Sequence, residues 1–78
     1  MPVIDFFEGL KILLYTNDHN PPHFHVNYGE FSAMVEIETL QIIHGQLPSK
    51  QYKKVVEWAM PRKSDLLIKF QILNPKLR

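Results

Sequence analysis

Polar and apolar side chains alternate along two short stretches that are separated by Gly29 and Glu30. Residues 23–28 place polar side chains at odd positions, and residues 31–37 place apolar ones there. This alternation is typical of strands with one buried face, and a two-residue loop that begins with glycine suits a type II′ turn. The pattern predicts an antiparallel hairpin whose register is set by the turn. The predicted pairs are Tyr28 with Phe31, Asn27 with Ser32, Val26 with Ala33, His25 with Met34, Phe24 with Val35, and His23 with Glu36.

Two further stretches are predicted to form strands. Residues 10–16 are rich in β-branched, apolar and aromatic side chains, and they are apolar on both parities. A strand covered on both faces has this composition. Residues 40–44 predict a fourth strand that returns after the hairpin and places Ile43 beside Met34. On this parity His44 faces the core, and we interpret it as structural.

Two helices are predicted in the second half of the chain. Pro48 opens the first, and an apolar stripe follows at helical spacing, formed by Tyr52, Val55, Val56 and Ala59. Pro61 is expected to interrupt this helix, because its ring clashes with the preceding turn. Ser64 is expected to cap a second helix, which ends at Asn74 and Pro75. Its stripe is formed by Leu66 or Leu67 with Phe70 and Leu73.

Strands followed by helices are the order of an α+β domain. We predict a small antiparallel sheet of three or four strands followed by two helices packed on one face, in a single domain spanning residues 1–78. Trp58 borders the apolar stripe of the first helix, and we interpret it as a core residue rather than a docking anchor.

The length and composition of the chain limit which classes of binding partner are expected. A chain of 78 residues has a thin core, and the absence of cysteine removes disulfides and thiolate chemistry. A homodimer or a second protein is therefore expected to cover apolar surface. The net charge of +1 gives little support to nucleic-acid binding. The start lacks the basic region of a secretory signal, and no apolar run reaches the ~20 residues that span a bilayer. We expect a cytoplasmic protein.

A nine-residue segment beginning at Asp18 contains three of the four histidines and two consecutive prolines. His23 and His25 point to the same side of the predicted strand, roughly 7 Å apart, and Glu36 lies across from His23. Two imidazoles and a carboxylate can hold a divalent metal such as zinc, manganese or iron. Asp18 or His19 would then be a further ligand or would handle protons as a catalytic residue.

Other interpretations of the same segment stay open. In a structural interpretation, Pro21 and Pro22 direct the chain into the strand, and the two histidines pair with Glu36 and solvent. In a binding interpretation, the histidines share a mixed sheet face with Met34 and one parity of residues 10–16, and a second subunit or partner protein covers that face. A ribonuclease without metal would use the two histidines as general base and acid.

Residues 15–26, followed by Tyr28 and Gly29, resemble the signature of the DUF4160 family. Residues 45–48 and 56–59 match that family as well, so the likeness covers nearly the whole chain. The resemblance implies a small prokaryotic protein. Genes of this family often lie beside a DUF2442 gene, an arrangement that suggests toxin–antitoxin pairing.

We therefore expect a small binding module of a toxin–antitoxin-like two-gene system. Its expected partner is a second copy of the chain or a DUF2442-like protein, with nucleic acid as a further candidate. The alternative is a metal-dependent hydrolase or ribonuclease that uses His23, His25 and Glu36.

Overall fold

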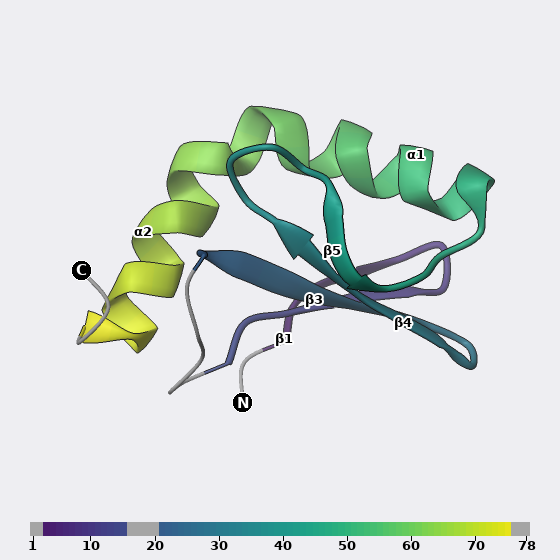
Figure 1. Cartoon of the computed structure of the whole chain (residues 1–78), viewed down its shortest axis with the longest axis horizontal. Coiled ribbons are helices and arrows are strands. Elements are labelled where there is room, and N and C mark those ends of the chain that lie inside the picture. The colour runs from purple at the N-terminus through teal and green to yellow at the C-terminus, as the bar shows by residue number, and fades with distance from the viewer. Residues whose placement is uncertain (1–2, 16–20, 76–78) are drawn as a thin grey trace.

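The computed structural model describes residues 3–15 and 21–75. The chain forms one antiparallel sheet followed by a helical segment, which confirms the predicted α+β class (Figure 1). Each strand pairs with the next one along the chain, in the order β1-β2-β3-β4-β5. The elements are β1 (Val3–Phe7), β2 (Leu10–Leu13), β3 (His23–Tyr28), β4 (Phe31–Glu36), β5 (Ile42–Gly45), α1 (Ser49–Ala59), the 3₁₀ turn η1 (Met60–Arg62) and α2 (Lys63–Leu73).

The sheet has five strands rather than the predicted three or four, because β1 was not expected. β1 and β2 form a hairpin in which Phe7 pairs with Leu10 across Glu8 and Gly9. Both turn residues have positive φ, +48° and +80°, as a type I′ turn requires. Glutamate is not a residue that such turns favour, so the sequence pattern does not reveal this hairpin.

The β3–β4 hairpin has the predicted register at all six pairs, from Tyr28 opposite Phe31 to His23 opposite Glu36. Gly29 has a φ of +56°, as predicted for the first residue of the turn. The alternating pattern therefore placed Phe24 and Val26 correctly on the core face.

The β4–β5 pair contains a bulge that the sequence did not predict. Ile42 pairs with Val35 and His44 pairs with Met34, so Ile43 is an extra residue between them. A bulge turns the residues that follow it to the other face of the sheet. The prediction that Ile43 lies beside Met34 is therefore wrong, and so is the core-facing position predicted for His44.

The helical segment is continuous over residues 49–73, whereas two separate helices were predicted. At Pro61 the chain tightens into the 3₁₀ turn η1, and Figure 1 shows α1 and α2 meeting there at a bend. The missing N–H of proline is tolerated at the start of such a turn. Ser64 does not cap α2: the helix begins at Lys63, and its N-cap residue Arg62 makes no side-chain cap hydrogen bond. α2 ends before Asn74, as expected.

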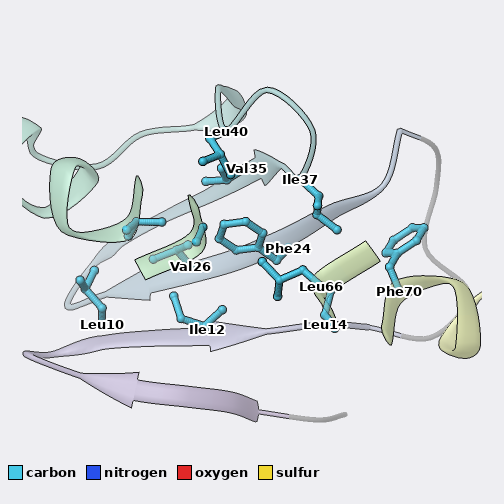
Figure 2. Close-up of a cluster of buried hydrophobic side chains, with 12 residues drawn as sticks. Leu10, Ile12, Leu14, Phe24, Val26, Val35, Ile37, Leu40, Leu66 and Phe70 are labelled. Atoms are coloured by element: carbon cyan, nitrogen blue, oxygen red, sulfur yellow. The ribbon is translucent and has the colours of Figure 1, made fainter. Parts of the chain in front are cut away.

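The hydrophobic core lies between the sheet and the helical segment. Figure 2 shows Phe24 within this cluster, with Leu66 and Phe70 entering from α2. Trp58 packs against the cluster and stacks on Phe7 at a ring-centroid distance of 5.9 Å, which supports its interpretation as a core residue. Within the described residues, no helix combines the length and the hydropathy needed to cross a membrane.

Candidate functional site

The side chains of the sheet that point away from the helices form what we call the open face. Strand register arranges them in two rows across the sheet. The first row contains Val3, Leu13, His25, Met34 and His44, and the second contains Phe6, Lys11, Asn27 and Ser32. The helices cover the other side of the sheet (Figure 1). Of the two parities left open for residues 10–16, the structure therefore places Leu13 beside the histidines.

His23 lies at the start of β3 and is 2% exposed. Its Nδ1 atom donates a hydrogen bond to the carbonyl oxygen of Pro21 at 2.7 Å. The ring also lies 5.8 Å from the ring of Phe70 in α2. His23 thus connects the proline segment to the beginning of the strand and packs against the last helix, which is a structural role for this side chain.

His25 occupies the centre of the first row and is half-buried. The Tyr15 ring meets it edge-on, with centroids 4.3 Å apart and planes at 89°. The His23 ring lies 5.1 Å away. His25 also lines a hollow of about 170 Å³ on the open face, which it shares with Asn27, Ser32, Ala33, Met34 and His44.

Glu36 pairs with His23 as predicted, but its surroundings differ from those of His25. It lines a separate pocket of about 260 Å³ between the start of β3 and α2, together with Pro21, Pro22 and Leu67. Among residues 3–15 and 21–75, no three histidine, aspartate or glutamate side chains are grouped as metal ligands. The proposed ligand set of His23, His25 and Glu36 stays a prediction from the sequence.

The two remaining candidates, Asp18 and His19, lie outside the described residues. Their predicted roles as catalytic residues or further metal ligands stay predictions.

His44 is the site residue that sequence reasoning assigned to the wrong face. The bulge at Ile43 brings it opposite Met34 on the open face, where it is exposed. A signal was present in the sequence: two adjacent isoleucines, Ile42 and Ile43, interrupt the alternation just before it. The first row therefore places the imidazole of His25 on β3, the thioether of Met34 on β4 and the imidazole of His44 on β5 side by side.

Gly45 fixes the position of β5 against β4 directly after His44. Its φ is +79°, and a Cβ atom at this position would lie 2.2 Å from the carbonyl oxygen of Ser32. The same oxygen accepts a hydrogen bond from the backbone N–H of Gln46 at 3.0 Å. Only glycine allows the two backbones to approach this closely, so Gly45 holds His44 beside Met34.

A five-stranded antiparallel meander with one helical segment on one face, and with an apolar and imidazole-containing surface on the other, defines a small α+β domain with an open sheet. The family model of the "Domain of unknown function (DUF4160)" matches residues 9–71. The chain therefore belongs to the DUF4160 family, as the motif in residues 15–26 predicted. No match was found among curated proteins or among solved structures.

Proposed function

We propose that this protein is a small protein-binding module and that its open face binds the partner. The observation that carries the proposal is the exposure of large apolar side chains there: Phe6 is 62% exposed and Val3 is 49% exposed. Both lie on β1: Val3 shares the first row with the half-buried Met34, and Phe6 belongs to the second row, whereas Leu13 in the first row is only 1% exposed. An exposed apolar surface with polar neighbours is typical of protein contact sites.

The charge of the open face favours a protein over a nucleic acid. Lys11 is the only lysine or arginine among the nine side chains that define this face. Six cations of the second half of the chain belong to the helical segment on the other side of the sheet, namely Lys50, Lys53, Lys54, Arg62, Lys63 and Lys69, whereas Lys76 and Arg78 lie outside the described residues. Binding to nucleic acid depends on cations that neutralise phosphates, and the open face offers too few of them.

The partner that we propose is the second protein of a toxin–antitoxin-like pair, of the DUF2442 type. Membership of the DUF4160 family supports this choice, because genes of that family often lie beside a DUF2442 gene. The proposed role is therefore recognition of this partner through side-chain contacts on the open face.

The test is calorimetric titration of the protein with a purified DUF2442 protein from the same genome. Phe6→Glu and Met34→Glu each place a charge on the open face and are expected to weaken binding by about tenfold or more. Ile68→Glu is the matched control, because Ile68 is 54% exposed and belongs to α2. It is expected to leave the affinity unchanged. Because the contact is apolar, the affinity is also expected to change little between about 50 and 200 mM salt.

Three results would overturn the proposal. The first is the absence of binding by correctly folded protein. The second is weakening by Ile68→Glu alone. The third is self-association in sedimentation experiments that Phe6→Glu abolishes, because the open face would then bind a second copy of the chain.

A further inference from the structure

We propose that His25, Met34 and His44 bind one Cu⁺ ion on the open face. This inference goes beyond the proposed protein contact and does not depend on it. It rests on the order of three side chains across neighbouring strands: imidazole on β3, thioether on β4 and imidazole on β5. All three line the same hollow of about 170 Å³.

The spacing of these side chains suits a single ion. Met34 pairs directly with each histidine, so the two histidines stand two strand spacings apart, about 10 Å. Two imidazoles that lean over the central strand can close this span around one ion, with metal–nitrogen bonds of about 2 Å. Met34 lies on the strand between the two histidines, and its thioether supplies the third ligand of the proposed site.

The chemistry of the ligands selects the metal. Thioether sulfur is a soft ligand and favours Cu⁺, whereas carboxylates favour harder divalent ions. The three ligands carry no negative charge, which suits a monovalent cation. Within the part of the chain that the structure describes, no cluster of three histidine, aspartate or glutamate side chains offers a divalent ion a competing site. Copper(I) is therefore the ion that we propose for these three ligands, and zinc, manganese or iron at His23, His25 and Glu36 stays a separate prediction.

His44 is positioned by its surroundings, whereas His25 has to turn toward β4 to share the ion. Its ring packs edge-on against Tyr15, which follows β2, with centroids 4.3 Å apart, and sharing an ion with His44 breaks this contact. His44 follows the bulge at Ile43 and precedes Gly45, whose close approach to Ser32 fixes the end of β5. Bulges often turn a side chain toward a functional site. Such support around a ligand is part of what a preorganised metal site needs.

The experiment is an anaerobic titration of the metal-free, tag-free protein with Cu⁺ in competition with a chromophoric Cu⁺ chelator. The expected result is one Cu⁺ per chain, with a shift of the Met34 methyl signal in NMR spectra. Met34→Leu and His44→Leu are each expected to weaken binding by about tenfold or more. Asn27→Ala is the matched control, because Asn27 lines the same hollow but is not one of the three ligands. It is expected to bind Cu⁺ as the unaltered protein does.

Circular dichroism establishes that each variant is folded, and Met34→Leu is the variant that conserves volume best. The proposal is overturned if the chelator removes all Cu⁺ at equimolar concentration. It is also overturned if Met34→Leu and His44→Leu bind normally while His19→Ala does not, since the ion would then sit at the histidine-rich segment. The titration uses the isolated protein, and partner binding is measured without metal, so failure of one proposal is distinguishable from failure of the other.

Discussion

The indole nitrogen of Trp58 donates a hydrogen bond to Oδ2 of Asp5 at 2.7 Å, which connects α1 to the first strand of the sheet. β1 is an edge strand and pairs only with β2, so this contact is a second attachment for it. The Trp58 ring also stacks on Phe7 of the same strand. The edge strand is therefore held by backbone pairing on one side and by a helix side chain above it.

We expect the Asp5–Trp58 hydrogen bond to contribute about 1.5–3 kcal/mol to the free energy of unfolding, since its acceptor is a carboxylate oxygen and the contact is partly buried. A double-mutant cycle with Asp5→Ala and Trp58→Phe, followed by urea denaturation, measures the coupling. The control is the exposed pair of Asp65 and Lys69, one helical turn apart, which is expected to couple by less than about 0.5 kcal/mol. Equal coupling in the two pairs would contradict this prediction.

Gly45→Ala is expected to destabilise the protein by about 2 kcal/mol or more. The new Cβ would clash with the Ser32 carbonyl, and the positive φ adds strain. Gly29→Ala is the matched comparison, because Gly29 also has positive φ but no atom within 4 Å of the added Cβ. It is expected to cost about 1 kcal/mol. Thermal unfolding of both variants checks the order, and a larger loss for Gly29→Ala would show that the approach at Gly45 is not constrained.

Asn74→Ala is expected to lower the free energy of unfolding by about 1–3 kcal/mol. The Asn74 side chain is buried, and its Nδ2 atom donates to the carbonyl oxygens of Tyr15 and Phe70 at 3.0 and 3.1 Å. The substitution removes the side-chain donor from both carbonyl oxygens, while Phe70 keeps the bond from the backbone N–H of residue 74. The connection between the end of α2 and Tyr15 is therefore weakened. Hydrogen exchange of the α2 amides measures this local loss, and unchanged protection at Phe70 would contradict it.

Ile68→Glu and Ile72→Glu are expected to change stability by less than about 0.5 kcal/mol each. Both side chains are more than half exposed on α2, with Ile72 at 69%. Chemical denaturation of the isolated protein checks this expectation, on which the use of Ile68→Glu as a binding control depends. Leu66→Ala truncates a core side chain and is expected to lower the free energy of unfolding by about 2–5 kcal/mol. A comparable decrease for Ile68→Glu or Ile72→Glu would show that this side of α2 is covered.

Local sequence patterns predicted the structure correctly where neighbouring residues alone determine it. The β3–β4 register follows from alternation and from a turn that begins with Gly29, so all six pairs could be predicted. β1 could not, because Glu8 occupies a turn position with positive φ that the sequence does not mark. The continuous helical segment was also missed, because Pro61 was expected to end a helix and instead occupies a 3₁₀ turn.

Only part of the candidate site was predicted, because local patterns determine the positions of some of its residues and not of others. The sequence placed His25 and Met34 on one sheet face, which the register confirms. It assigned His44 to the other face, because the bulge at Ile43 reverses parity and depends on contact with β4 rather than on local preference. The burial of His23 under Phe70 also depends on where α2 packs, and spacing along the strand carries no information about that.

The strict order of the sheet has a consequence for how the chain folds. Since every strand pairs with its immediate neighbour in sequence, each pairing step closes a short loop and has a small entropic cost. Proteins dominated by such local contacts fold faster than other β-rich proteins of similar size. Assembly can begin at the tight β3–β4 hairpin and extend outward in both directions. Packing of α2 against β3 then joins the last helix to the middle strand of the sheet.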